Sequence, residues 1–222
     1  MKPKVYIIGS GGHAKVVIDA IESTEQYLIA GLIDDFKSQH DMSLNYPIVG
    51  KVNDIPSLVI QQQPLNLFLA IGDNYSRYNI LEKLKKFSIN INFISIVHRN
   101  ATVSKHAHIA SGSIIMANAC IGPSAVIKEH VVVNHGSSID HDCIIDNFAS
   151  TSPGATLCGS VRVKQFSVVG AGAVIIEKVT IGENCLIGAG STVISNIESN
   201  QLAVGTPAKA ISKRVLGSKY LK

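Results

Sequence analysis

The chain has 222 residues, a net charge of +4, 46% hydrophobic residues and only 5% aromatic residues. No segment approaches the roughly 18 uninterrupted apolar residues of a membrane span. The basic residues form no stripe interleaved with aromatic residues of the kind that binds nucleic acid. The first apolar run, residues 5–8, is too short for a secretory signal and is typical of a buried strand. We therefore expect a cytoplasmic protein that neither inserts into a membrane nor binds nucleic acid.

The first 95 residues alternate between strand and helix patterns. The sequence predicts strands over residues 5–8, 27–33, 67–71 and 91–96, and helices over residues 15–23 and 76–87. This alternation is typical of a parallel sheet with helical crossovers. Because about 95 residues supply little more than one half of a dinucleotide-binding domain, we predict an α/β Rossmann-like half domain over residues 1–95.

A glycine-rich turn follows the first predicted strand. Gly9, Gly11 and Ala14 match the dinucleotide fingerprint G-x-G-x-x-G/A, and Asp34 lies about 20 residues further along. Glycines let the backbone approach a ligand, and the helix that starts here favours anions. In so small a domain a mononucleotide or sugar nucleotide fits better than NAD. The alternative is that the glycines serve only tight packing of helix on sheet.

The second half of the chain repeats with a period of six. From Val97 to Val193 every sixth residue is aliphatic except Thr151, and two positions before each, from the second onward, stands a small or β-branched residue. This period fits neither a helix nor a meander, but it does fit short strands wound three to a coil in a parallel β-helix, so that residues 18 apart stack. We predict an all-β domain over residues 96–222, with roughly five uninterrupted coils and a C-terminal tail.

Two histidines fall in a turn column of this repeat, at coil corners near the surface. His141 lies between Asp140 and Asp142, and a neighbouring carboxylate orients an imidazole and raises its basicity, as a general base near neutral pH requires. His135 is the second candidate. No histidine stacks one coil away from His135 or His141, so no metal is expected, and only a metal shared between chains stays open.

At this point the sequence resembles the PglD/NeuD-type sugar acyltransferases along nearly its whole length. The segments that carry the resemblance are 9–13, 34–36, 70–74, the hexapeptide run, 134–142 and 205–209. The resemblance implies a left-handed β-helix, a homotrimer with its active site between subunits, and acetyl-CoA as co-substrate. It further implies N-acetylation of a 4-amino-4,6-dideoxy sugar carried on a nucleotide.

The same resemblance assigns individual residues. His141 matches the general base, and Asp142 matches the acidic residue that orients it. The implied contacts with the nucleotide-linked sugar are Gly11, Gly12, His13, Asp34, Asp35, Gly72 and Asn134, and those with acetyl-CoA are Ser150, Gly159, Ala171 and Ala189. Close relatives often carry a histidine at the position of Ser150, whose hydroxyl is still able to donate a hydrogen bond near the thioester.

Other functions stay open at this stage. They are O-acetylation of a sugar such as sialic acid, nucleotide-sugar binding without catalysis, and a metalloenzyme of the γ-carbonic-anhydrase type. Phe36 and Lys37 favour a uridine nucleotide slightly, but the sequence does not decide between UDP, GDP and dTDP.

Overall fold

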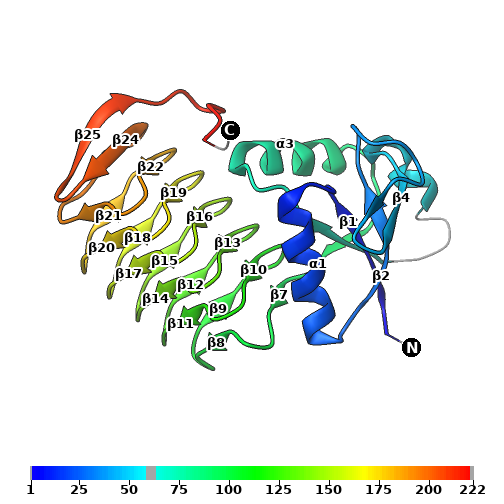
Figure 1. Ribbon diagram of the computed structural model, residues 1–222, viewed down its shortest axis with the longest axis horizontal. Helices are drawn as coiled ribbons and strands as arrows, with labels where there is room; N and C mark the ends of the chain where they lie inside the picture. The colour runs from blue at the N-terminus through cyan, green and yellow to red at the C-terminus, as the bar shows by residue number, and fades with distance from the viewer. Residues whose placement is uncertain (1, 59–63, 221–222) are drawn as a thin grey trace.

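The computed structural model describes residues 2–58 and 64–220, which form an α/β layer and a triangular β-helix (Figure 1). The outer limits of the two predicted domains, residues 1 and 222, lie outside this description. In the described parts of the chain, no helix combines the length and the apolar character that crossing a bilayer requires.

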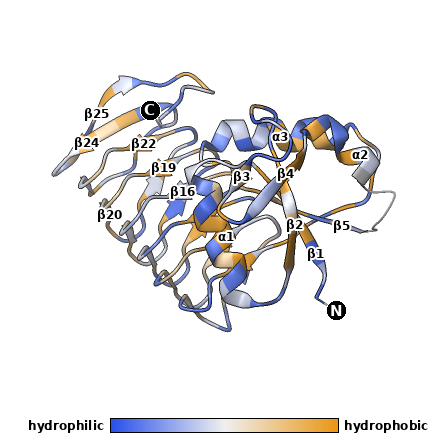
Figure 2. Ribbon diagram, turned by 45° about the vertical axis from the view of Figure 1, so that its right-hand side comes forward, coloured by the Kyte–Doolittle hydropathy of each residue, from blue (hydrophilic) through white to orange (hydrophobic). Residues whose placement is uncertain are grey.

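The N-terminal layer is a six-stranded sheet with the order β3-β4-β2-β1-β5-β6. Its strands are β1 (Lys4–Ile8), β2 (Leu28–Ile33), β3 (Met42–Ser43), β4 (Tyr46–Gly50), β5 (Leu65–Leu69) and β6 (Ile91–Phe93). Its helices are α1 (Gly12–Thr24), η1 (Val52–Asp54), α2 (Ile55–Leu58) and α3 (Asn74–Lys85). All neighbouring strands are parallel except β3 and β4. Hydrophobic residues run along β2 and part of α1 (Figure 2), as the buried side of a sheet and its crossover helix requires.

The predicted alternation of strands and helices is confirmed, with three differences. The hairpin of β3 and β4 and the short helices η1 and α2 were not predicted, because their apolar runs are too short to show a period. Helix α1 begins at Gly12, inside the predicted glycine turn. The predicted strand over residues 91–96 is two strands, since β6 pairs with β5 whereas β7 (Ile96–Val97) pairs with β10 of the β-helix.

The second half is a left-handed β-helix of two-residue strands. They are β7, β8 (Thr102–Val103), β9 (His108–Ile109), β10 (Ile114–Ile115), β11 (Cys120–Ile121), β12 (Val126–Ile127), β13 (Val132–Val133), β14 (Ser138–Ile139), β15 (Ile144–Ile145), β16 (Ser150–Thr151), β17 (Thr156–Leu157), β18 (Arg162–Val163), β19 (Val168–Val169), β20 (Val174–Ile175), β21 (Thr180–Ile181), β22 (Leu186–Ile187) and β23 (Thr192–Val193). The hairpin of β24 (Gln201–Gly205) and β25 (Ala208–Lys213) closes the C-terminal end by pairing with β22.

The register confirms the period of 18. Every third strand pairs in parallel, so that Ile121 lies beside Ile139 and Ile127 beside Ile145. The predicted inward column is buried from Ile115 to Val193. Its first member, Val97, is instead 36% exposed, because no earlier coil covers it.

Helix α3 fixes the α/β layer to the β-helix through a column of turn residues. His130, Phe148 and Phe166 lie 18 residues apart in the same left-handed turn conformation, with φ of 55°, 57° and 62°. The rings of His130 and Phe148 stack at 5.0 Å, and Tyr78 of α3 packs edge-on against Phe148 and Phe166, each at 5.4 Å. Aromatic contacts of this kind stabilise a junction beyond the apolar area that they bury.

A buried arginine completes this junction. Arg77 of α3 is only 1% exposed, and its guanidinium donates to the carbonyl oxygens of His130 (3.0 Å) and Ile71 (2.7 Å) and to Oδ1 of Asn74 (2.8 Å). Burial lowers the pKa of Arg77 to about 10, so the side chain is still cationic at neutral pH. Backbone carbonyls, rather than a carboxylate, therefore satisfy this charge where the two halves of the molecule meet.

Candidate functional site

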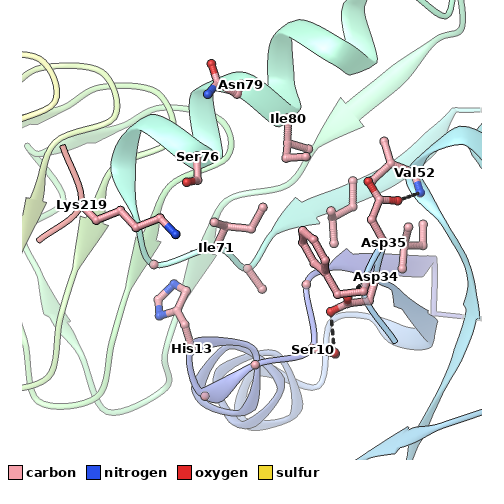
Figure 3. Close-up of a pocket in the computed structure, with 18 residues that line it drawn as sticks. Ser10, His13, Asp34, Asp35, Val52, Ile71, Ser76, Asn79, Ile80 and Lys219 are labelled. Atoms are coloured by element: carbon pink, nitrogen blue, oxygen red, sulfur yellow. Dashed lines mark hydrogen bonds between the residues drawn. The ribbon is translucent and has the colours of Figure 1, made fainter. Parts of the chain in front are cut away.

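A cavity of about 600 Å³ opens at the carboxyl ends of β1, β2 and β5 (Figure 3). The loops that follow these strands line it, together with residues from α3 and the C-terminal tail. Six residues predicted to bind the nucleotide-linked sugar all lie on this cavity, namely Gly11, Gly12, His13, Asp34, Asp35 and Gly72. Parallel strands bring such loops to one edge, which is where α/β sheets bind ligands.

The glycines of the turn have two different roles. Gly9 has φ of +107°, and a Cβ there would lie 2.8 Å from the carbonyl oxygen of Ala70, so tight packing requires this glycine. A Cβ at Gly11 or Gly12 would meet nothing within 4 Å. The packing explanation therefore holds for Gly9, whereas Gly11 and Gly12 leave space in which a ligand can approach the backbone.

The start of α1 is suited to an anion. Its N-cap, Gly11, offers no side-chain hydrogen bond, and the first turn contains no acidic residue. The first N–H groups of a helix have no partner within the helix, and the helix dipole is positive at this end. Phosphate oxygens are the groups that such an end binds in nucleotide sites.

The two aspartates hold the opposite side of the cavity. Asp34 accepts hydrogen bonds from Oγ of Ser10 (2.6 Å) and from its own loop, and Asp35 accepts from the backbone N–H of Val52 (2.8 Å) and pairs with Lys83 (3.3 Å). Both carboxylates therefore shape the loops as well as lining the cavity. Phe36 is 99% exposed and lines the same cavity, so its ring is free to stack on a base.

A second cavity of about 220 Å³ lies between the α/β layer and the β-helix. His13 and Gly72 line both cavities, while Asn134 and Ser150, from the faces of the β-helix, line only the second. The structure thus places Ser150, predicted to contact acetyl-CoA, beside Asn134, predicted to contact the sugar. Tyr220 from the C-terminal tail also lines this cavity.

His13 is the titratable group at the junction of the two cavities. Burial, together with smaller contributions from the charges of Arg77 and His135, lowers its pKa to about 4. The ring is therefore neutral at physiological pH. Its Nε2 is buried and has no hydrogen-bond partner among the described residues. Buried polar atoms are normally paired, so this nitrogen is available to a ligand.

The predicted base lies elsewhere, at a corner of the β-helix. His141 follows β14 and is exposed, with Nδ1 2.8 Å from Oδ2 of Asp142. The hydrogen bond to Asp142 and the charge of Asp140 raise the pKa of His141. Since the carboxylate accepts a hydrogen bond from the N–H of Nδ1, the neutral ring presents the lone pair of Nε2 to solvent.

Gly159 lies one coil beyond His141, directly against its ring. A Cβ at Gly159 would be 2.5 Å from both Cε1 and Nε2 of the imidazole. Real Cβ atoms essentially never come so close, so the ring of His141 can occupy this position only because residue 159 is a glycine. Stacking at 18 residues explains why this glycine and this histidine meet.

Unlike Ser150, the other three residues predicted to bind acetyl-CoA, Gly159, Ala171 and Ala189, lie along one sheet of the β-helix. The sheet contains β14, β17 and β20, and Gly159 lies at the edge where its strands end, beside His141. Ala171 and Ala189 lie where its strands begin, in the column of His135. None of these residues, nor Asp142, lines either cavity. Within one chain, the predicted base and the predicted sugar site are therefore apart.

Sequence reasoning missed the contribution of the C-terminal tail. Lys219 lines the first cavity, and Tyr220 donates a hydrogen bond to the carbonyl of Gly72 (2.7 Å). The tail carries no motif, and it lies 148 residues from Gly72 in the sequence. Among residues 2–58 and 64–220, no group of three or more His, Cys, Asp or Glu side chains is arranged to hold a metal ion.

The fold and these sites define a hexapeptide-repeat acyltransferase with an added nucleotide-binding layer. Residues 4–84 match the family model of the PglD N-terminal domain, and residues 160–195 match that of the bacterial transferase hexapeptide (six repeats). The chain resembles PerB from Caulobacter crescentus, solved with CoA and GDP-perosamine, at 33% identity over 94% of this chain and 97% of that one, with a TM-score of 0.87.

Two further relatives agree. The acetyltransferase domain of PglB from Neisseria gonorrhoeae, solved with acetyl coenzyme A, is 32% identical over 95% of this chain and 100% of that one, with a TM-score of 0.86. UDP-N-acetylbacillosamine N-acetyltransferase of Bacillus subtilis (strain 168) is 37% identical over 114 residues, a segment that spans half of this chain and half of that enzyme. The chain belongs to the PglD/NeuD-type family of sugar-nucleotide acetyltransferases.

Proposed function

We propose that this protein transfers the acetyl group of acetyl-CoA to the amine of a nucleotide-linked 4-amino-4,6-dideoxy sugar, with His141 as general base. The observation that carries the proposal is the contact between Nδ1 of His141 and Asp142, which leaves Nε2 free beneath Gly159. Likeness over almost the whole chain to PerB, solved with CoA and GDP-perosamine, and to the PglB domain, solved with acetyl coenzyme A, supports this proposal.

The reaction needs one base and no covalent enzyme intermediate. The neutral amine attacks the thioester carbonyl, forming the C–N bond, and Nε2 of His141 takes the proton that the amine loses. The C–S bond then breaks, and the proton passes from the imidazolium to the departing CoA thiolate. Asp142 is a positioning residue that orients the ring and stabilises the transient imidazolium.

The nucleotide-linked sugar is assigned to the two joined cavities. The uncapped start of α1, with Gly11 and Gly12, faces the phosphates, and the aspartates with Phe36 lie toward the nucleoside. The sugar then lies toward His13, Gly72 and Asn134. For acetyl-CoA we assign the sheet edges at Gly159, Ala171 and Ala189, with Ser150 near the thioester.

We further propose a homotrimer that works in the cytoplasm. His141 lines neither cavity of its own chain, which supports a site completed by a neighbouring chain. Crystals of a variant of the Caulobacter enzyme with one histidine replaced by alanine contain both CoA and GDP-perosamine. The cysteines Cys120, Cys143, Cys158 and Cys185 are all free thiols, which agrees with a reducing compartment.

A thiol-release assay tests this function. Acetyl-CoA is offered with UDP-, GDP- and dTDP-linked 4-amino sugars, and in parallel with matched sugars that carry a hydroxyl in place of the amine. We expect CoA release only with amine acceptors, and with one nucleotide strongly preferred. Release with the hydroxyl sugars would instead identify an O-acetyltransferase. No release from any acceptor, despite nucleotide-sugar binding, would overturn catalysis altogether.

A further inference from the structure

The chain after β25 does not project into solvent but returns to the start of α3 (Figure 1). We call residues 215–220 the C-terminal strap. Nη2 of Arg214 donates to the carbonyl of Ser218 (2.8 Å), and the N–H of Ser218 donates to the carbonyl of Val215 (3.0 Å). Gly217 has φ of +85° and lies so close to the ring of Tyr75 that a Cβ would come within 3.0 Å of it. A turn and a packing contact thus fix the path of the strap.

Tyr220 anchors the end of the described strap at the point that the two cavities share. Its hydroxyl donates to the carbonyl of Gly72 (2.7 Å), which also accepts from Arg77 (3.2 Å). Burial raises the pKa of Tyr220, so the phenol stays a neutral donor. The anchor lies next to the loop that joins β5 to α3, and it places the preceding residue at the rim of the first cavity.

That preceding residue is Lys219. Figure 3 shows its ammonium group extending into the cavity above His13 and beside Ser76, on the side away from Asp34 and Asp35. No described carboxylate lies within ion-pairing distance of this ammonium, and it makes no hydrogen bond with the described residues. The cationic group is therefore available to a ligand in the cavity.

The other lysines near the cavity are engaged. Lys83 pairs with Asp35 at 3.3 Å, and Lys37 donates to the carbonyl of Ser10 at 3.2 Å. Lys219 and the uncapped start of α1 are thus two positive features on the same side of the cavity, contributed by opposite ends of the chain. Paired positive features of this kind favour an anion with more than one charge, such as a diphosphate.

We propose that Lys219 binds the diphosphate of the nucleotide-linked sugar and that the strap, anchored by Tyr220, closes the cavity over it. This inference rests on the proposed function for the identity of the complete substrate. It goes beyond that function by assigning the binding of the diphosphate charge to a tail that lies outside the glycine turn and outside the hexapeptide coils. The strap makes the phosphates, rather than the base alone, a determinant of recognition.

Calorimetric binding of UDP, GDP and dTDP, compared with uridine, guanosine and thymidine, tests the proposal without requiring turnover. The variant is Lys219→Ala, and the matched control is Lys105→Ala, which removes an exposed lysine from the first coil, away from both cavities. We expect Lys219→Ala to weaken binding of the preferred diphosphate about tenfold and to leave nucleoside binding unchanged. Lys105→Ala should match the wild type. Tyr220→Phe should weaken diphosphate binding in the same direction, by about threefold.

The outcomes separate this inference from the proposed function. Selective loss of diphosphate binding by Lys219→Ala supports the strap even if no acetyl transfer is found. If the enzyme turns over, the same variant should raise KM for the nucleotide sugar about tenfold while kcat and KM for acetyl-CoA stay unchanged. Unchanged diphosphate binding, equal loss of nucleoside and diphosphate binding, or failure of the wild type to bind any diphosphate would each overturn the inference.

Discussion

The β-helix and the α/β layer position functional groups by different means. In the β-helix, a residue's place follows from its number, because residues 18 apart stack, and this alone brings Gly159 against His141. The cavity of the α/β layer is instead assembled from loops after three strands, one helix and the strap. A change in the β-helix should therefore affect one step of the reaction, while a change around the cavity should affect substrate binding.

The sharpest test of this division is removal of the proposed base, His141. We expect His141→Ala to lower kcat about 100-fold or more, the range typical of a lost general base. Because His141 lines neither cavity, binding of the nucleotide sugar measured by calorimetry should not change. His135→Ala serves as the comparison and should lose much less. A kcat near the wild-type value for His141→Ala would refute the assignment.

Two glycine substitutions, one in each region, should again affect different kinetic parameters, with smaller changes than the loss of His141. Gly159→Ala places a methyl group where it would lie 2.5 Å from Cε1 and Nε2 of His141, so the ring must move. We expect kcat to fall about tenfold, as displaced catalytic groups do. Gly12→Ala meets no protein atom within 4 Å and should keep kcat while raising KM for the nucleotide sugar. The reverse pattern in steady-state kinetics would contradict the division of roles.

The pH profile of kcat/KM should report the Asp142 hydrogen bond. That bond is the largest of the causes that raise the pKa of His141, so activity is expected to fall as pH drops through this raised value. In Asp142→Asn the carboxylate is lost, and the acid limb should move to lower pH, toward the ordinary histidine value of about 6.5. Asp140 supplies a smaller part of the shift, so Asp140→Asn is the control and should move the limb less. An unmoved acid limb in Asp142→Asn would show that the hydrogen bond to Asp142 does not determine the pKa of the group that controls activity.

The smallest expected effect concerns stability at the junction of the two halves. Burial lowers the pKa of His130 from 6.5 to about 4, so the folded protein binds fewer protons than the unfolded chain between these values. Stability is therefore full above about pH 6.5 and is lost as pH falls toward 4, by roughly 1 to 3 kcal/mol for this group. In His130→Phe, which keeps an aromatic ring, this pH dependence of the free energy of unfolding should weaken.

Urea unfolding of the wild type and of His130→Phe at pH 7 and pH 5 measures this pH dependence of the free energy of unfolding. His106→Asn, at an exposed position on the first coil, is the control and should leave the pH dependence as it is. His13, whose pKa is also lowered to about 4, contributes to the slope in the same direction. If His130→Phe retained the full slope, the junction would not be the source of acid sensitivity.

The sequence alone predicted the β-helix well because its core is a local, repeating property. Even Thr151, the exception in the aliphatic column, is accommodated in the core, since it is 1% exposed and its hydroxyl bonds to Oγ of Ser137 (3.0 Å). Val97 was misplaced because period alone does not show that the first coil lacks a neighbour. The hairpin of β3 and β4 was missed because β3 has only two residues and β4 only five, too few to show a clear alternation.

The candidate site was only partly predictable, for the same reason. The glycine turn and Asp34 form a motif of known spacing, and the structure gathers them at one cavity. That Asp34 and Asp35 are already bonded to Ser10 and Val52 depends on how loops meet, which spacing does not reveal. The strap lies still further from prediction, because Tyr220 and Gly72 meet only after both halves have folded.

The buried guanidinium of Arg77 has a consequence for motion. Its Nε donates to the carbonyl of His130 in the coils, and its partner Asn74 donates to the carbonyls of Phe166 and Ser167. Any hinge between the layer and the coils would have to break these hydrogen bonds beside a buried charge. Such breakage is costly, and the two halves are expected to move as one block. Domain closure is then unavailable for shielding the thioester from water, and in the proposed trimer that protection would come from a neighbouring chain and from the bound substrates themselves.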